Sequence, residues 1–240
     1  MTGVQTCALP ISTRVLQANG CEVQMPANQV CCGALHAHAG DLEGARLLAR
    51  QNIEAFDADG DGAIVTNAGG CGAMLASYAH LLADDKQYAD RARRLSARVR
   101  DVGQQFKAIG FRNGAAIGFE RTTYDASCHL LHGQGGADAS LQMLWAIPDL
   151  SFAVLSGSDV CCGGAGVYNL LEPELSEQVL AEKLGNIEQS GATVLATGNA
   201  GCHMQIAAGA RLAGIKLKVC HPVELLDESY RRAGFYVASE

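Results

Sequence analysis

The sequence VCCGA at residues 30–34 returns as VCCGG at residues 160–164, and each copy is followed by one more cysteine in a related setting. That setting reads TNAGGC at residues 66–71 and TGNAGC at residues 197–202. The trailing cysteine stands 39 residues after the first doublet and 40 residues after the second. A block of this length that recurs with the same spacing indicates two copies of one supersecondary unit.

Length and composition agree with two small globular domains. The chain has 240 residues, of which 48% are hydrophobic and 18% charged, and its net charge is −7. Domains of about 100–150 residues are common, so we expect a first domain at residues 13–112 and a second at residues 113–240. No apolar run is long enough for a membrane span, and no large Lys/Arg cluster suggests a nucleic-acid partner. Residues 1–12 have no counterpart in the second half and are expected to be a non-native leader.

The cysteine content points to metal binding in a reducing compartment. The chain has ten cysteines, too many for incidental core residues. Disulfide-rich secreted proteins are usually shorter and carry a signal peptide, and adjacent cysteines are poor disulfide partners. We therefore expect a cytoplasmic protein whose thiolates are committed to a metal.

Short apolar runs alternate with longer amphipathic segments, a pattern typical of parallel α/β sheets. We expect an α/β fold of two similar parallel-sheet blocks, the duplicated unit, with flanking helices. Asp41 is the expected N-cap of one helix and Pro222 the expected start of the last. Strands are expected at residues 21–25, 63–66, 123–126, 152–155, 193–196 and 216–219, and the main helices at residues 41–56, 86–109 and 173–188 and from residue 222 onward.

The cysteines of both copies are candidate ligands of an iron–sulfur cluster. Sites in parallel α/β sheets form beyond the carboxyl ends of the strands, and several of these cysteines follow predicted strands. A [4Fe–4S] cluster is held by four thiolates that converge from separate loops. The second block offers Cys128, Cys161, Cys162 and Cys202, and the first block offers Cys31, Cys32 and Cys71.

Glycines beside these cysteines are the candidate cofactor-binding backbone. They are Gly33 and Gly70 in the first block and Gly163, Gly164 and Gly201 in the second. Because they have no side chain, their N–H groups can approach the sulfides of a cluster. Helix N-termini are expected after Cys162 and Cys202, where exposed N–H groups would favour the thiolate.

Two other interpretations of the cysteines stay open on the residues alone. Single cysteines are often buried as small apolar residues, which is what we expect of Cys21 and Cys220. Structural zinc normally shows CxxC or CxxH spacing, and neither occurs here. The pairs Cys128-His129, Cys202-His203 and Cys220-His221 are adjacent, so their side chains would tend to point apart. The duplicated signature favours iron–sulfur ligation over both.

At these motifs the sequence resembles the cysteine-rich CCG domain family. That family includes the cysteine-rich component of heterodisulfide reductase, the lactate-utilisation iron–sulfur proteins and the iron–sulfur subunit of glycolate oxidase. The resemblance extends over about residues 13–235 and is strongest to the C-terminal portion of the glycolate oxidase branch. Its motifs are CCGA at 31–34, NIEA at 52–55, GGCGA at 69–73, CCGGAG at 161–166, AGC at 200–202 and HPVEL at 221–225.

The sequence departs from the family pattern in three places. The fullest pattern ends each unit in CxxC, but Met74 and Gln205 occupy the last positions, as in the glycolate oxidase branch. The first unit lacks its leading cysteine, which puts a cluster there in doubt. An N-terminal ferredoxin-like domain with CxxCxxCxxxCP runs is absent from these 240 residues.

The resemblance implies an oxidoreductase subunit for electron transport, without catalytic residues of its own. It would pass electrons from a flavoprotein partner that oxidises glycolate toward a membrane acceptor pool. The flavin would lie on that partner, the ferredoxin-like domain would complete the subunit, and the complex would sit peripherally at the inner face of the cell membrane. The alternatives are a lactate-utilisation or heterodisulfide-reductase-like subunit and, in another class, a cluster-free thiol-rich interaction module.

Overall fold

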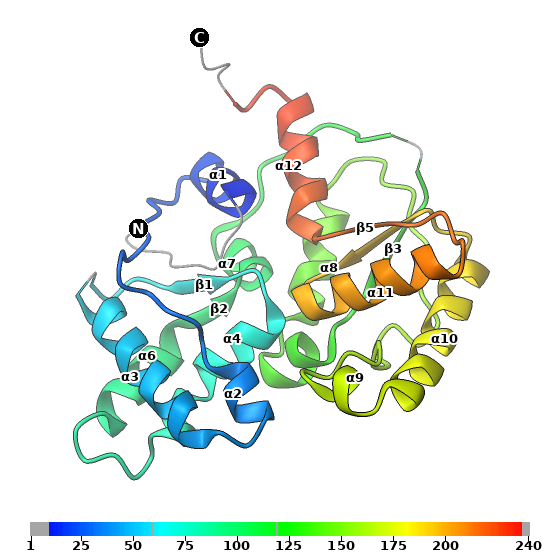
Figure 1. Cartoon of the computed structure of the whole chain (residues 1–240). Helices are drawn as coiled ribbons and strands as arrows, with labels where there is room; N and C mark the ends of the chain where they lie inside the picture. Colours follow the sequence, from blue (N-terminus) through cyan, green and yellow to red (C-terminus); the bar gives the residue numbers. More distant parts are fainter. Residues whose placement is uncertain (1–9, 59, 119, 237–240) are drawn as a thin grey trace.

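Two small parallel sheets organise the chain, each with helices around it (Figure 1). The computed structural model describes residues 10–58, 60–118 and 120–236. The first sheet pairs β1 (Ile64–Thr66) with β2 (Val99–Asp101), and the second has the order β3-β4-β5, formed by Thr122–Asp125, Val194–Thr197 and Lys218–Cys220. All pairings are parallel. This confirms the predicted α/β class with parallel sheets.

The helices of the first block begin with α1 at Pro10–Ala18. They continue with α2 (Ala34–His38), α3 (Leu42–Asp57), α4 (Gly69–Ala76), α5 (Tyr78–Leu81), α6 (Ala89–Arg98) and α7 (Val102–Ile109). The second block has a π-helical turn η1 (His129–Gly133), followed by α8 (Ala137–Trp145), α9 (Tyr168–Leu171), α10 (Pro173–Ser190), α11 (Ala200–Leu212) and α12 (Pro222–Arg232). None of the helices in the described residues is both long and apolar enough to cross a membrane.

Two predicted helix starts are confirmed in detail. Asp41 caps α3, since its side chain accepts a hydrogen bond of 2.9 Å from the backbone N–H of Gly44. Pro222 is the first residue of α12, where its missing N–H costs nothing. His221 caps this helix by accepting from the N–H of Val223 at 3.1 Å.

Four predicted elements are wrong. The predicted helix at residues 86–109 is interrupted by β2, which pairs with β1 in the register Ile64↔Val99. Residues 21–25 form no strand, because the N–H of Cys21 bonds back to Leu16 at the end of α1. Residues 152–155 contribute a single bridge, Thr122↔Phe152, in place of a strand. No helix begins directly after Cys162, because the chain turns through residues 163–167 before α9.

One hydrophobic core crosses from the first block to the second. It joins Val65 and Phe106 to Tyr124, Val194 and Leu226. Helix α1 takes part through Val15 and Leu16, and the guanidinium of Arg14 on this helix pairs with Asp227 of α12 at 2.8 Å. The domain boundary predicted between residues 112 and 113 therefore stays a prediction from the sequence repeat, since both halves of the chain share one hydrophobic core.

The leader predicted at residues 1–12 lies mostly outside the described residues, which begin at residue 10. Residues 10–12 form the first turn of α1. Ser12 is fully buried there, and its Oγ accepts a hydrogen bond of 3.2 Å from Asn67. This turn thus packs as part of the fold.

Candidate metal centre

The four candidate ligands of the second block lie beyond the carboxyl ends of the strands. Cys128 follows β3 and precedes η1, whereas Cys202 is the third residue of α11, which follows β4. Cys161 and Cys162 are in the turn before α9. This is the edge at which parallel sheets place their functional residues, and it is where the sequence predicts them.

Their thiols form a continuous series of contacts. Cys128 donates a hydrogen bond to Cys161, and Cys162 lies within hydrogen-bonding reach of both Cys161 and Cys202, to either of which its single S–H can donate. The hydrogen bond from Cys128 lowers the pKa of Cys161, and the one from Cys162 lowers the pKa of Cys202. The pKa of each donating thiol is correspondingly raised. Residues far apart in the sequence thus bring four sulfurs into one cluster.

Nitrogen donors surround these sulfurs. The N–H of Gly163 donates to Cys161 Sγ at 3.3 Å, and Nδ2 of Asn199 donates to Cys202 Sγ at 3.4 Å. Gly164 lies beside the doublet, since a Cβ built on it would be in ordinary contact with Cys162 Sγ at 3.5 Å and with the carbonyl oxygen of Gly201 at 3.8 Å. Four thiols with N–H donors nearby are the kind of donor set that an iron–sulfur cluster uses.

Gly163 occupies a position of this turn where glycine is needed for two reasons. Its φ is +87°, a conformation that side chains disfavour, and an added Cβ would lie 2.4 Å from the carbonyl oxygen of Ser176. The hydroxyl of Ser176 in turn donates to the carbonyl oxygen of Gly163 at 2.8 Å. The turn that carries the doublet is therefore docked onto the first turn of α10.

The first block brings three thiols together. Cys32 is buried and contacts both Cys31, which is exposed, and Cys71, which is half-buried. The hydrogen bond with Cys71 lowers the pKa of Cys32 to about 6. Cys71 is the third residue of α4, the same helical position that Cys202 has in α11. The duplicated sequence motifs thus gather thiols in the same way in both blocks, with three thiols in the first block and four in the second.

Cys21 and Cys220 lie apart from both thiol groups and belong to the shared core. Burial raises the pKa of each thiol. Among the described residues, no three His, Cys, Asp or Glu side chains surround a single point as ready ligands of one metal ion. The thiols of each block are arranged as a series of pairwise contacts instead.

The two blocks meet through their trailing-cysteine turns. The N–H of Gly69 donates to the carbonyl oxygen of Gly198 at 2.9 Å. Next to this contact is a cavity of about 290 Å³ between α2, α4 and η1, where the rings of His38 and His129 are edge to face with centroids 5.5 Å apart. His129 is adjacent to Cys128, and Gly70 of the same cavity is adjacent to Cys71. The two thiol groups therefore flank one junction.

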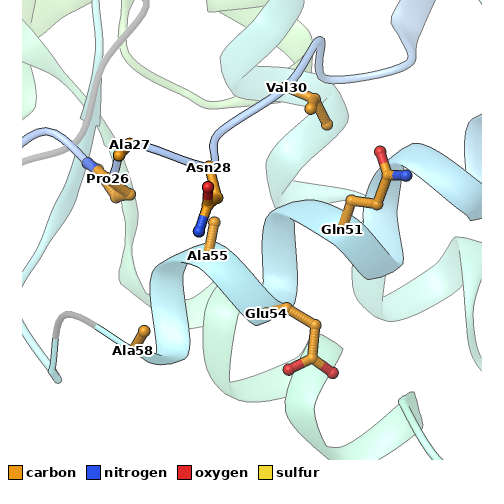
Figure 2. A pocket seen from close by; sticks show the side chains of 8 residues that line it. All are labelled: Pro26, Ala27, Asn28, Val30, Gln51, Glu54, Ala55 and Ala58. Carbon is orange, nitrogen blue, oxygen red and sulfur yellow. The ribbon is translucent and has the colours of Figure 1, made fainter.

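A larger cavity, of about 510 Å³, lies elsewhere in the first block. Figure 2 shows Pro26, Ala27 and Asn28 of the connecting loop facing Gln51 and Ala55 of α3. None of the candidate ligands lines it. Its size does not make it the reactive site, because the thiols are gathered beyond the strand ends.

The buried polar residues that support the cysteine-bearing segments are not among the residues that the sequence predicts for the site. Lys183 of α10 and Asp125 at the end of β3 form an ion pair of 2.7 Å, with side chains 0% and 2% exposed. In the first block, Asn52 accepts from the N–H of Val30 and donates to the carbonyl oxygen of Cys31, both at 3.0 Å. A lysine on the buried face of an amphipathic helix is unusual, and that signal could have revealed Lys183.

A model of the cysteine-rich domain family, CCG, matches residues 9–76 and 122–207. The two matched segments contain all seven candidate ligands. The chain belongs to this family. The predicted resemblance is confirmed: the first CCG segment contains β1 and the first thiol group, and the second contains β3, β4 and the second thiol group.

Relatives of this CCG protein include two kinds of protein. It is 36% identical over 221 residues to the probable glycolate oxidase iron-sulfur subunit of Bacillus subtilis, a match to 90% of this chain and 50% of the relative. It is 32% identical over 217 residues to lactate utilization protein A of Shouchella clausii, and 30% identical over 224 residues to that of Bacillus subtilis. The first of these two matches covers 90% of this chain and 90% of the relative, and the second covers 93% of each. The chain thus spans about half of the glycolate oxidase relative, and its relatives support a redox role as an iron–sulfur subunit.

Proposed function

We propose that this CCG protein is the iron–sulfur electron-transfer subunit of a glycolate-oxidising complex. The observation that carries the proposal is the series of four thiols from Cys128 to Cys202, which separate segments bring to one strand edge. A [4Fe–4S] cluster bound there would supply one-electron transfer between a flavin on a partner protein and a membrane acceptor. In this proposal the flavoprotein partner binds and oxidises the hydroxy acid.

The protein's own part is to hold and tune the sulfurs. Cys128, Cys161, Cys162 and Cys202 would be the ligands, and the N–H of Gly163 and the amide of Asn199 would hydrogen-bond them. Such hydrogen bonds stabilise the more negative, reduced state. Cys31, Cys32 and Cys71 would bind iron in the first block, where a four-iron cluster would need a fourth ligand from elsewhere.

The glycolate oxidase branch is favoured over heterodisulfide-reductase chemistry by the two positions that depart from the fullest family pattern. Met74 and Gln205 replace the last cysteine of each unit, as in the glycolate oxidase branch that the sequence resembles. Lactate utilisation is the second candidate, since those relatives match over nine tenths of their length. The predicted flavoprotein partner, the ferredoxin-like domain and the cytoplasmic location at the inner face of the membrane belong to this proposal.

Anaerobic reconstitution with iron and sulfide tests the proposal. We expect iron and acid-labile sulfide in the wild type, loss of most of it in Cys161→Ser, and retention in the matched control Cys220→Ala, a buried thiol outside both groups. If the wild type folds but retains no iron, the proposal fails and the cluster-free, thiol-rich interaction module is the remaining interpretation. Dye reduction by the reconstituted complex with its flavoprotein, driven by glycolate or by lactate, then decides between the two substrates.

A further inference from the structure

Lys183 is the most deeply buried charged side chain beside the thiols. Its side chain is 0% exposed, although lysines are almost never fully buried unless they are paired. Its Nζ donates to Asp125 Oδ1 at 2.7 Å, to the carbonyl oxygen of Gly157 at 2.7 Å and to that of Ser158 at 3.4 Å. Three acceptors match the three N–H bonds of an ammonium group.

Each acceptor belongs to a segment that carries a candidate ligand. Asp125 ends β3, three residues before Cys128, and the carbonyls of residues 157 and 158 precede the doublet at 161–162. The other carboxylate oxygen of Asp125 accepts from Thr197 Oγ1 at 3.0 Å, and Thr197 ends β4, five residues before Cys202. The ammonium group of Lys183 and the carboxylate of Asp125 together therefore connect all three segments that converge on the site.

Stability of the fold does not explain a charge at this place. A buried ion pair is costly to desolvate, and apolar replacements of both partners are often neutral or stabilising. The site does contain negative charges that the ammonium group can offset. The thiolates of Cys161 and Cys202 lie close enough to the carboxylate of Asp125 to repel it. Without the ammonium, a carboxylate would face the sulfurs alone.

The first block provides an internal comparison. The sequence Asn-Ile-Glu at residues 52–54 of α3 corresponds to residues 186–188 of α10. Three residues before these motifs stand Ala49 in α3 and Lys183 in α10, and both are buried. The buried cation is thus present in the block that gathers four thiols and absent from the corresponding position of the block that gathers three.

We propose that Lys183 is a positioning residue of the second-block site, whose ammonium group fixes the three cysteine-bearing segments and provides positive charge against the thiolates. The proposal deepens the electron-transfer function and rests on it for the charge effect. The fixing of the segments concerns the apoprotein and can be measured without a cluster.

The test compares Lys183→Met, which keeps an unbranched side chain one atom shorter and removes its charge, with the control Lys216→Met at an exposed lysine. Residues that orient metal ligands typically contribute 10–100-fold to metal affinity. We expect Lys183→Met to retain iron about 10–100-fold more weakly in a chelator challenge and the midpoint potential of the remaining cluster to fall. Lys216→Met should match the wild type in both.

Thiol alkylation of the apoprotein, quantified for each cysteine by mass spectrometry, supplies the second readout. We expect Cys128, Cys161 and Cys202 to react faster in Lys183→Met while Cys32 and Cys71 keep their wild-type rates. An increase at all cysteines would show a merely structural role and overturn the proposal, as would wild-type rates throughout. If the wild type binds no iron, the electron-transfer function fails, and the alkylation pattern still decides the positioning role.

A second variant guards against misfolding. If circular dichroism shows that Lys183→Met does not fold, Lys183→Met/Asp125→Leu removes both charges and carries the same measurements. We expect it to fold and to show the selective alkylation and the weaker iron retention. A folded double variant with wild-type iron retention and alkylation would overturn the proposal.

Discussion

The backbone N–H of Gly70 donates a hydrogen bond of 3.0 Å to Oδ1 of Asn199, across the junction of the two blocks. The Nδ2 of the same amide donates to Cys202 Sγ at 3.4 Å. One side chain therefore connects the turn next to Cys71 with a candidate ligand of the other block. The duplicated turns are in direct contact, and a change in one can reach the sulfur of the other.

Substitution of Asn199 should separate its two hydrogen bonds. Asn199→Asp keeps an acceptor for the N–H of Gly70 but loses the donor to Cys202 and adds negative charge, so iron retention should fall while the stability of the apoprotein stays near wild type. Asn199→Ala loses both, and we expect a further loss of about 1 kcal/mol in unfolding free energy. Denaturant unfolding and iron content measure the two effects. Wild-type iron retention in Asn199→Asp would contradict the role of the N–H···S bond.

Two glycines near the second doublet should respond to alanine in opposite ways. Gly163 directly follows the doublet, and Gly185 lies within α10, the helix that contacts the doublet's turn. Gly163→Ala should destabilise the protein by more than about 1–2 kcal/mol, because φ is +87° and the added Cβ would meet the carbonyl oxygen of Ser176. Gly185→Ala should stabilise it by about 1 kcal/mol, because this residue is within α10 and nothing lies within 4 Å of the new Cβ. Thermal unfolding of both variants checks the opposite signs. Equal changes in stability for the two variants would show that the turn at residue 163 can change conformation to accommodate a side chain.

The sequence predicts those parts of the site that depend on local pattern. The doublets and the trailing cysteines are visible because they repeat, and their position follows from short apolar runs such as residues 193–196 that end just before them. β2 is not predictable in this way. Residues 99–101 continue an amphipathic pattern, and they become a strand because β1 pairs with them. The side chain of Asp101 then caps α7.

The support of the sulfurs depends on contacts that no local pattern contains. The ion pair between Asp125 and Lys183 joins residues 58 positions apart, and the hydrogen bond between Gly70 and Asn199 joins residues 129 apart. Neither pair has a spacing that a helix or strand would impose. The contact between the two duplicated turns is likewise a property of how the blocks pack, and the repeat alone does not reveal it.

The loop of the first doublet should depend on Asn52. Its side-chain amide accepts a hydrogen bond from the N–H of Val30 and donates to the carbonyl oxygen of Cys31. It also donates to the hydroxyl of Tyr78. That hydroxyl in turn donates to the carbonyl oxygen of Cys32 at 2.8 Å. Asn52→Leu leaves one buried and two partly buried groups without this partner at up to about 1–3 kcal/mol each, so we expect a loss larger than that of a single hydrogen bond. Tyr78→Phe removes one bond and should cost about 1 kcal/mol.

Denaturant unfolding of both variants measures the difference, with the exposed Gln51→Leu on the same helix as control. The control should stay close to the wild type, since its side chain lies on the exposed face of α3. If Asn52→Leu were no less stable than Tyr78→Phe, the amide would not hold the loop, and another contact would have to position Cys31 and Cys32.

Asp101 should make the fold more stable in mild acid than at neutral pH. The carboxyl is fully buried at the end of β2, and burial raises its pKa to about 7. Its Oδ1 accepts from the N–H of Gly103 at 2.8 Å and lies 3.2 Å from Ser140 Oγ, whereas Oδ2 has no partner among the described residues. Because an unfolded aspartate has a pKa of about 3.9, the folded state holds a proton that the unfolded state releases.

The contribution of Asp101 is therefore fully present below about pH 4 and is lost as the pH rises toward and through 7, at about 1.4 kcal/mol per pKa unit. Asp101→Asn imitates the protonated form, so its stability relative to the wild type should increase steadily between pH 4 and pH 7 in denaturant unfolding. Ser140→Ala removes a hydrogen bond that lowers the pKa of Asp101, so in this variant the loss of stability should continue to higher pH than in the wild type. A stability difference between Asp101→Asn and wild type that does not change with pH would show that the carboxyl titrates normally in the fold.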